Sequence, residues 1–266
     1  MPGHLRSIAA SPVDFSCMIK ISVVTAVFNG ERTIAQAIES VLDQNYPAVE
    51  SVVIDGASRD ATLSILEPYR PRLGKLISEP DEGIYDALNK GIRHATGDVV
   101  GFLHADDLFE DDDVLAKVAA AFADPDVDAV YGDLVYVRHD NVGQIIRYWK
   151  SGSYDPAALA RGWMPPHPTF YVRRAVYERL GGFDTRYRIA ADYDTVLRFL
   201  AVNKIRAAYI PEVLVRMRTG GISNRSLRTI LRKSKEDYEV IRRNQLGGLA
   251  TILQKNFSKL NQFWRK

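Results

Sequence analysis

The adjacent pair Asp106 and Asp107 is the sharpest chemical signal in this sequence, because it ends the apolar run DVVGFLHADD. Neighbouring carboxylates at the end of a buried strand repel each other and lose hydration, so they need a cation or strong hydrogen-bond donors. A hard divalent cation, shared with the phosphates of a nucleotide, meets that need. Alternatively, the two residues begin a turn or cap a helix near residues 111–122.

A second acidic group, Asp55, follows another apolar run and precedes GASRDAT. A carboxylate at a strand end can accept a hydrogen bond from a ring N–H, which uracil, thymine and guanine offer and adenine and cytosine do not. We therefore expect Asp55 to contact a ligand. For Ser58 and Asp60 we favour a structural role, as caps of the helix that follows.

The third group lies in GGFDTRYRIAADYD, where Asp192 opens a helical pattern. A carboxylate beside a glycine-flanked loop is suited to act as a general base toward a substrate hydroxyl, and helix capping is the alternative. His167, between two prolines, is expected to contact substrate. No G-x-x-x-x-G-K-[ST] or G-x-G-x-x-G motif follows the first strand, so the diphosphate charge must be met by metal and side chains.

Alternating strands and helices are needed to bring these groups together. β-Branched apolar runs alternate with segments of helical periodicity, which predicts βαβ units and a parallel sheet. The expected strands are residues 19–28, 49–58, 75–78 and 98–107, and the expected helices are 34–42, 62–69 and 84–95.

The strong strands all end in polar residues, and ligands of open parallel sheets bind at the carboxyl ends of the strands. We therefore expect one shared site built from residues 25–29, 55–60 and 104–107. Further along, residues 127–139 predict a mixed or antiparallel strand with 144–150 as its hairpin partner, and residues 174–180 and 192–203 predict helices.

Composition agrees with a globular α/β domain. The 266 residues include 35 Lys and Arg, 33 Asp and Glu, and 46% hydrophobic residues, which excludes disordered and collagen-like classes. The single cysteine, Cys17, permits no intramolecular disulfide, which fits a cytoplasmic protein. No apolar run approaches the roughly 20 residues that span a bilayer. Residues 1–17 lack periodicity and are expected to be a flexible extension.

The last segment, residues 225–266, carries eleven Lys and Arg against three acidic residues. Two helical stripes flank a Gly-Gly break. The first is expected to pack on the catalytic domain. The second, residues 249–266, combines basic residues with Phe and Trp, which favours an anionic membrane surface at the inner face of the cell membrane. No nucleic-acid-binding motif accompanies the charge, so no nucleic-acid partner is expected.

Four ordered segments together resemble glycosyltransferase family 2, the inverting nucleotide-sugar enzymes of GT-A fold. They are SVVTAVFNGERTIAQAIESVLDQNYP, VVIDGASRDATLSIL, SEPDEGIYDALNKGIRHATGDVVGFLHADD and PPHPTFYVRRAVYERLGGFDTRYRIAADYDTVLRF, followed by GGIS. The first half of the third segment, SEPDEGIYDALNKGI, is similar to bacterial enzymes of O-antigen, exopolysaccharide and colanic-acid-type assembly. The resemblance implies a GT-A domain over residues 18–224, with a mostly parallel sheet flanked by helices.

The resemblance also implies roles for individual residues. Asp192 would be the catalytic base and Asp107 the ligand of Mn²⁺ or Mg²⁺, while Asp55 would read the base, most simply uracil. Apart from the resemblance, we place His104 and His167 on the side of the sugar or acceptor; the alternatives are that His104 weakens the ribose-side network or joins the metal shell and that His167 only fixes a loop. The other nucleotide-binding residues would be Thr25, Phe28, Asn29, Asp81, Lys90 and Asp106.

The implied reaction moves a sugar from a nucleoside-diphosphate donor to a glycan or lipid-linked acceptor in cell-surface polysaccharide synthesis. Two positions depart from the family pattern: His104 stands where Asp or Asn is usual, and Ala191 where Glu is usual. They leave open a non-catalytic nucleotide-sugar-binding or scaffold protein. A sugar-1-phosphate nucleotidyltransferase is a further alternative, although the glycine-rich basic loop of such enzymes is replaced here by TAVFNGERT.

Overall fold

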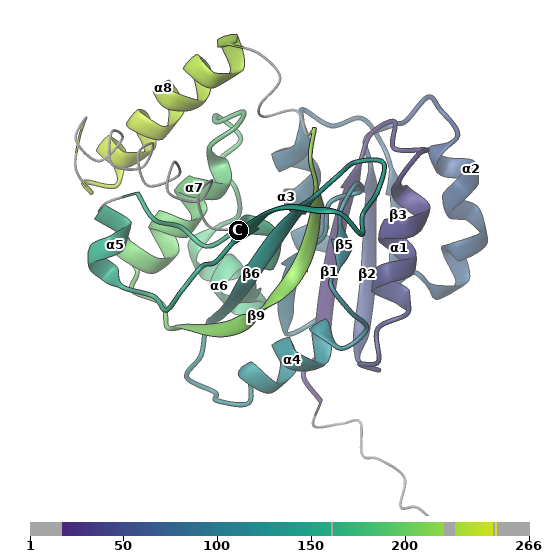
Figure 1. Cartoon of the computed structure of the whole chain (residues 1–266), viewed down its shortest axis with the longest axis horizontal. Helices are drawn as coiled ribbons and strands as arrows, with labels where there is room; N and C mark the ends of the chain where they lie inside the picture. The colour runs from purple at the N-terminus through teal and green to yellow at the C-terminus, as the bar shows by residue number, and fades with distance from the viewer. Residues whose placement is uncertain (1–17, 161, 221–226, 247, 249–266) are drawn as a thin grey trace, which may run out of the picture.

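The computed structural model of the chain describes residues 18–160, 162–220, 227–246 and 248 (Figure 1). The strands are β1 (Ile21–Val27), β2 (Val49–Asp55), β3 (Lys75–Ser78), β4 (Val99–Phe102), β5 (Leu108–Phe109), β6 (Ala129–Val137), β7 (Ile145–Trp149), β8 (Tyr171–Arg173) and β9 (Ala207–Arg218). The helices are α1 (Ile34–Leu42), α2 (Thr62–Leu66), α3 (Ile84–His94), α4 (Val114–Ala121), α5 (Pro156–Ala160), α6 (Arg174–Leu180), α7 (Ala191–Val196) and α8 (Leu227–Arg243), with 3₁₀ turns η2 (Glu67–Arg72) and η3 (His167–Thr169) and a π-helical continuation of α7, η4 (Leu197–Val202).

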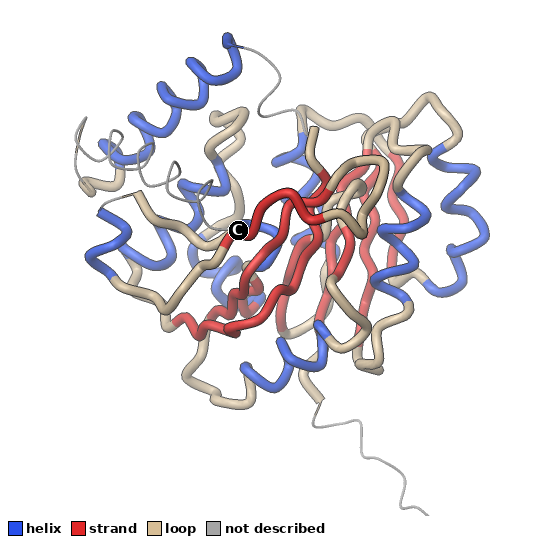
Figure 2. The backbone as a smooth tube through the Cα atoms, in the orientation of Figure 1, coloured by secondary structure: helices blue, strands red, loops and turns tan. Residues whose placement is uncertain are grey.

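The parallel half of the sheet has β1 at its centre. β1 pairs in parallel with β2 on one side and β4 on the other, and β2 pairs in parallel with β3. All seven residues of β1 are buried. Successive side chains of a strand point to opposite faces, so Val24 packs with Leu88 of α3 while Val23 packs with Val41 of α1. Helices therefore cover both faces of the sheet (Figure 2), as the unbroken apolar runs predict.

Gly91 allows α3 to lie close against β1. A Cβ atom at this position would stand 2.2 Å from Cγ1 of Val24, which is closer than real side chains approach. The glycine therefore sets the distance between α3 and the strand, and with it the position of the loop that enters α3.

The other half of the sheet is mixed. The strand order is β3-β2-β1-β4-β8-β6-β9-β5, and β7 pairs with β6 off this path. The predicted strand 127–139 and its hairpin partner 144–150 are confirmed as β6 and β7. β8 and β5 are short additions that the sequence patterns did not reveal.

The strand β9 also escaped prediction, although it has twelve residues. It contains Pro211, which cannot donate to a sheet ladder and usually argues against a strand. The β6–β9 register shifts between the pairs Tyr131–Tyr209 and Asp133–Val213, and Pro211 lies within that irregularity. The strand thus continues past the proline to Arg218.

The helix α8 packs beside α7 (Figure 1), and its Val240 and Ile241 are fully buried. The expectation that the first C-terminal helix packs on the domain is therefore confirmed for the described residues. The expectations for residues 1–17 and 249–266 concern segments outside them. In the part of the chain that the structure describes, no helix has the length and apolarity needed to cross a bilayer.

Candidate active site

The polar ends of β1, β2 and β4 meet at one edge of the sheet. Val27 at the end of β1 is in register with Asp55 at the end of β2, and Val24 is in register with Phe102 of β4. The loops that follow these strands therefore begin side by side. The predicted convergence of the three polar groups is confirmed.

A cavity of about 670 Å³ opens at this edge, lined by Phe28, Gly56, Asp81, Glu82, Gly83 and Arg188. Phe28 is 61% exposed, so its ring is available for stacking on a planar ligand. A Cβ on Gly56 would lie 2.4 Å from Oδ2 of Asp81. Glycine at this position lets the Asp81 carboxylate cross the end of β2 and reach the cavity wall.

Asp55 is completely buried beside this cavity. The backbone N–H of Ser58 donates to its carboxylate at 3.1 Å, and the Ser78 hydroxyl donates to Oδ2 at 2.6 Å. A carboxylate has about four acceptor positions, so these bonds fix Asp55 and leave acceptor capacity for a ligand.

Asn29 and Thr25 support the same edge from β1 and the turn after it. Asn29 has a left-handed φ of 51°, its N–H donates to Oγ of Ser58, and its Oδ1 accepts the N–H of Arg59 at 2.9 Å. It thus ties the β1 turn to the β2 turn. Thr25 is fully buried within β1, and no group in the described residues bonds its hydroxyl.

Lys90 is bound to the loop that carries Asp81. Its ammonium group donates to the Pro80 carbonyl at 2.6 Å and forms ion pairs with Glu79 at 2.8 Å and Asp86 at 3.7 Å. The hydrogen bond to Glu79 raises the pKa of Lys90. Its charge is therefore shared with carboxylates, and it holds the loop that carries Asp81 to α3.

Asp106 and Asp107 occupy different environments. Asp107 is 1% exposed; its Oδ1 accepts the backbone N–H of Arg218 at 3.1 Å, and its Oδ2 has no partner in the described residues. Burial, and next the charge of Asp106, raise the pKa of Asp107 well above its usual range. Asp106 is half-buried, and none of the described groups bonds or pairs with its carboxylate.

Neither of these residues caps α4, whose N-cap position is Asp113. The capping alternative is therefore wrong, but the turn is confirmed, since the N–H of Asp107 donates to the His104 carbonyl at 3.0 Å. Arg218 covers the pair from the end of β9: its guanidinium donates to the Asp106 carbonyl at 2.6 Å and to the side chain of Gln36. Carboxylate oxygens are ligands that Mg²⁺ and Mn²⁺ prefer. The Asp106 carboxylate and the buried Oδ2 of Asp107 have no partner among the described residues, so both can bind such a cation. No cluster of three or more possible metal ligands occurs in the described residues, so phosphates would have to complete the shell.

His104 lies near both the acidic pair and the predicted base, Asp192. Burial lowers the pKa of His104, and the negative charges of Asp106 and Asp192 oppose that shift. The His104 and His167 rings lie 5.7 Å apart, and burial lowers the pKa of His167 to about 3. Both rings are therefore neutral at pH 7. Nδ1 of His104 and Nε2 of His167 are buried and find no partner in the described structure.

Asp192 lies in the first turn of α7, and the N-cap position is Ala190. Its Oδ1 accepts the N–H of Tyr193 at 2.8 Å and lies 3.3 Å from the Tyr85 hydroxyl. No described group bonds Oδ2. The N-cap alternative is therefore wrong, and one carboxylate oxygen remains available to take a proton.

Asp60 and Ser58 have structural roles, but the N-cap position of α2 is Ala61 and neither of them, so the capping prediction is wrong. Asp60 accepts the N–H of Thr62 at the start of α2 and also the N–H of Glu31. Ser58 accepts the N–H of Asn29. These residues join the β1 and β2 turns.

Comparison with known proteins adds the family. The model of glycosyl transferase family 2 matches residues 22–184, which is more than half of the chain. This chain belongs to glycosyltransferase family 2. It is 31% identical over 208 residues to the PGL/p-HBAD biosynthesis glycosyltransferase of Mycobacterium tuberculosis, covering 76% of this chain and 78% of the relative. The putative glycosyltransferase EpsE of Bacillus subtilis is 30% identical over 206 residues, covering 75% and 73%.

Solved structures share the GT-A fold of this family 2 enzyme. The S. aureus TarS 1–349 structure has a TM-score of 0.69 at 23% identity and covers 90% of this chain and 72% of that one. TarS has also been solved with UDP-GlcNAc. Mannosyltransferase PcManGT from Pyrobaculum calidifontis, in complex with GDP-Man and Mn²⁺, has a TM-score of 0.65 at 23% identity and covers 94% and 73%. Membership of family 2 contradicts the nucleotidyltransferase alternative.

Several residues at the site of this glycosyltransferase were not predicted from the sequence. Arg188 lines the cavity and donates to the Glu82 carbonyl at 2.6 Å. The sequence signal for Arg188 is its position four residues before Asp192, in the segment GGFDTRYRIAADYD. Tyr85 lies in the quoted segment SEPDEGIYDALNKGI, but only the fold brings it to Asp192. Arg218 belongs to the unpredicted β9.

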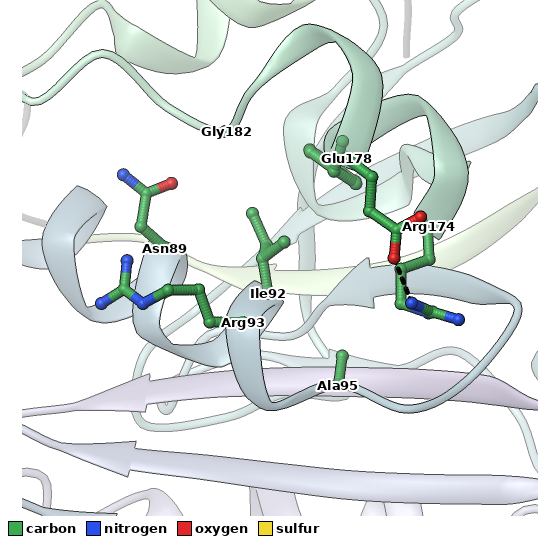
Figure 3. A pocket seen from close by; sticks show the side chains of 8 residues that line it. Asn89, Ile92, Arg93, Ala95, Arg174, Glu178 and Gly182 are labelled. Carbon is green, nitrogen blue, oxygen red and sulfur yellow. Dashed lines mark hydrogen bonds and ion pairs between the residues drawn. The ribbon is translucent and has the colours of Figure 1, made fainter.

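A second cavity of about 600 Å³ lies between α3 and α6 (Figure 3) and is lined in part by Asn89, Arg174 and Glu178. None of the predicted site residues lines it. Asn89 there exchanges two hydrogen bonds with the backbone of Phe183, at 2.8 and 2.9 Å. This cavity is therefore a feature of helix packing, and only the first cavity is lined by predicted site residues.

Proposed function

We propose that this family 2 enzyme transfers a sugar from a nucleoside-diphosphate donor, a UDP-sugar, to a glycan or lipid-linked acceptor in cell-surface polysaccharide synthesis. The observation that carries the proposal is the cavity at the carboxyl edge of the sheet, where Phe28 and Asp81 lie together with Arg188 from the loop that leads to Asp192. Residues proposed to bind the nucleotide and the loop of the proposed base thus line one cavity. The relatives solved with UDP-GlcNAc and with GDP-Man support a nucleotide-sugar donor.

The donor nucleotide would occupy the cavity beside β2. Its base would stack on Phe28 and hydrogen-bond with Asp55, while Asp81 and the turn fixed by Asn29 would enclose the nucleoside. Thr25 and Lys90 would support this pocket from β1 and from the Asp81 loop. Arg188, exposed at the cavity wall, would offer positive charge toward the diphosphate.

Asp192 would act as the base of a single displacement. Its free Oδ2 takes the proton of the acceptor hydroxyl, the hydroxyl oxygen attacks the anomeric carbon, and the bond from that carbon to the diphosphate oxygen breaks. One displacement inverts the configuration at the anomeric carbon. His104 and His167, both neutral, would hydrogen-bond hydroxyl groups of the sugar or acceptor.

The acidic pair would hold Mn²⁺ or Mg²⁺, which supplies positive charge to the leaving diphosphate. Exposure favours Asp106 as the carboxylate that meets the cation first. A direct role for Asp107, which the resemblance implied, requires the Arg218 cover to shift. Mn²⁺ in the PcManGT complex supports a divalent cation.

Release of nucleoside diphosphate from a panel of nucleotide sugars tests this function. We expect one UDP-sugar to be hydrolysed slowly without acceptor, and we expect EDTA to abolish the reaction and Mn²⁺ or Mg²⁺ to restore it. A chain that binds a nucleotide sugar but never hydrolyses or transfers it would instead be the scaffold protein. Full activity of Asp107→Ala and Asp106→Ala in EDTA would remove the metal assignment.

We also propose a peripheral position at the cytoplasmic face of the membrane, mediated by residues 249–266. The support is their sequence: basic residues alternate with Phe and Trp, and each Lys or Arg near an anionic surface contributes about 1 kcal/mol. Full-length protein should co-sediment with phosphatidylserine-containing vesicles at low salt and dissociate at high salt. Equal sedimentation of a chain lacking residues 249–266 would refute this role.

A further inference from the structure

The loop directly before Asp192 is held by a carboxylate from α8. Oε2 of Glu236 accepts the backbone N–H groups of Ile189 at 2.8 Å and Ala190 at 3.1 Å. Glu236 is only 8% exposed. A buried carboxylate is costly unless it is hydrogen-bonded, so these bonds bind it strongly to the loop.

The same loop is held from its other side by α3. The Tyr85 hydroxyl donates to the Ile189 carbonyl at 2.7 Å and lies 3.3 Å from Oδ1 of Asp192. Both backbone polar groups of Ile189 are therefore bound by side chains of other elements. The N–H is bound by Glu236 and the carbonyl by Tyr85, which fixes the chain three residues before Asp192.

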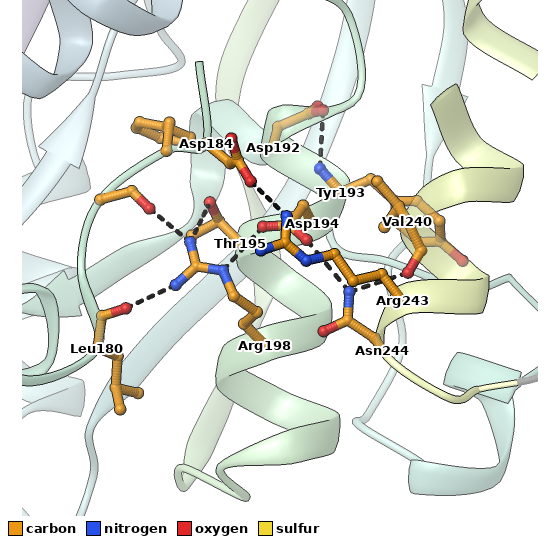
Figure 4. Close-up of polar contacts among 12 residues, drawn as sticks. Leu180, Asp184, Asp192, Tyr193, Asp194, Thr195, Arg198, Val240, Arg243 and Asn244 are labelled. Atoms are coloured by element: carbon orange, nitrogen blue, oxygen red, sulfur yellow. Dashed lines mark hydrogen bonds and ion pairs between the residues drawn. The ribbon is translucent and has the colours of Figure 1, made fainter. Parts of the chain in front are cut away.

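The position of α8 does not depend on Glu236 alone. Asn244 donates to Oδ1 of Asp194 at 3.1 Å, and Arg243 pairs with Asp184 at 2.8 Å (Figure 4). Val240 and Ile241 are buried against the core. Removing the Glu236 carboxylate should therefore release the loop while α8 stays docked.

We propose that Glu236 is a positioning residue for Asp192, which makes α8 part of the catalytic machinery although it lies beyond the family-matched residues 22–184. The inference rests on the proposed role of Asp192 as base. A base works only within hydrogen-bond reach of its proton, and a misplacement of about 1 Å can cost on the order of 10²-fold in rate. Glu236 acts through the backbone and touches no substrate.

Variants at position 236 distinguish the position of the accepting oxygen from the negative charge of the side chain. Glu236→Ala removes the acceptor, Glu236→Asp keeps the charge but withdraws the oxygen, and Glu236→Gln keeps an oxygen that can accept both N–H groups. The matched control is Glu239→Ala, since Glu239 lies on the same helix, is exposed and pairs only weakly with Lys235 at 3.8 Å. Release of UDP from UDP-GlcNAc, or from the UDP-sugar that the panel selects, gives kcat and KM, and calorimetry gives UDP affinity.

We expect Glu236→Ala to lower kcat about 10- to 100-fold and Glu236→Asp about tenfold, with donor KM and UDP affinity unchanged. Glu236→Gln should recover most of the lost kcat, and Glu239→Ala should match the wild type. Should Glu236→Ala fail to fold, the Asp and Gln variants decide the question in the same way. Wild-type kcat in Glu236→Asp would overturn the proposal, as would a parallel loss of kcat and UDP affinity.

Asp192→Asn, assayed in parallel, separates this inference from the proposed function. If Asp192→Asn is inactive and Glu236→Asp is fully active, only the positioning role fails. If Asp192→Asn keeps wild-type turnover, the assignment of the base fails and the positioning role fails with it.

Discussion

The two ends of the parallel sheet bury carboxylates in opposite ways. Glu50, near the start of β2, is 8% exposed, and both of its oxygens are bonded. The donors are the Ser22 hydroxyl, the Thr96 N–H and hydroxyl, and the Lys20 ammonium group. Burial by itself raises the pKa of Glu50, but these hydrogen bonds outweigh it and lower the pKa to about 2.

At the carboxyl edge, Asp107 is buried more deeply, at 1% exposed, but keeps an oxygen without a partner among the described residues. Burial raises its pKa, and the neighbouring Asp106 raises it further. Buried polar atoms of Thr25, His104 and His167 share this condition. The Glu50 carboxylate is fully bonded without a ligand and stabilises the fold, whereas the Asp107 carboxylate has bonding capacity left for one.

This contrast predicts that substitutions at the carboxyl edge change turnover with little effect on stability. Asp192→Asn should show the largest effect, a loss of roughly 10²–10⁴ in turnover, because proton transfer to the base is lost. Nucleotide-sugar binding should stay near the wild-type value. Steady-state kinetics measure turnover, and calorimetric titration with the donor measures binding. Unchanged turnover in Asp192→Asn would contradict the contrast between the two ends of the sheet.

Asp106→Asn should lower turnover by about 10²-fold, since the acceptor-only carboxylate offered to the cation becomes a neutral amide. The requirement for Mn²⁺ should shift to higher concentrations. Activity measured against Mn²⁺ concentration checks this, with Asp60→Asn as the control because Asp60 bonds only the β1 and β2 turns. Equal Mn²⁺ curves for wild type and Asp106→Asn would contradict the assignment.

Gly56→Ala should raise the donor KM about tenfold with kcat nearly unchanged, because its methyl group would displace the Asp81 carboxylate from the nucleotide cavity. Gly181 has a positive φ, where alanine would strain the backbone, so Gly181→Ala cannot serve as the control. Gly248 has ordinary φ and open space around it, so Gly248→Ala should leave KM unchanged. A wild-type KM for Gly56→Ala would remove Asp81 from the donor pocket.

Glu50→Gln should have no effect on turnover and should lower the free energy of unfolding by about 1–3 kcal/mol at pH 7, because the bonds to charge are weakened. The folded pKa of Glu50 lies below its ordinary value of 4.5. Its contribution is therefore complete above pH 4.5 and is lost as the pH falls toward 2. Chemical denaturation of both proteins between pH 7 and pH 3 tests whether their difference shrinks in that window.

Asp107→Asn should not lower the free energy of unfolding as Glu50→Gln does, which sharpens the comparison. The raised pKa of Asp107 means that its ionised form opposes folding above its ordinary pKa of 3.8. The amide should therefore leave stability at pH 7 unchanged or slightly higher, while turnover falls. A destabilisation as large as that of Glu50→Gln would show that Asp107 is a structural carboxylate like Glu50.

The sequence alone determined the parallel half of the fold and the edge at which the site lies. Unbroken β-branched runs such as residues 19–28 identify strands covered on both faces, and their periodicity is a local property of the chain. The polar residues that end them must then meet, because parallel neighbours end at the same side of a sheet. Asp55, Asp106 and Asp107 could be selected for this reason before any contact was known.

Only the tertiary structure decided which of these groups are bonded and which are free. Arg218 covers Asp107 from a strand interrupted by Pro211, and Glu236 reaches the loop before Asp192 from a helix more than forty residues further along the chain. Lys90 of α3 pairs with Glu79 in the loop that enters this helix. Burial and hydrogen bonding depend on contacts between residues distant in sequence, and local patterns carry no record of those contacts.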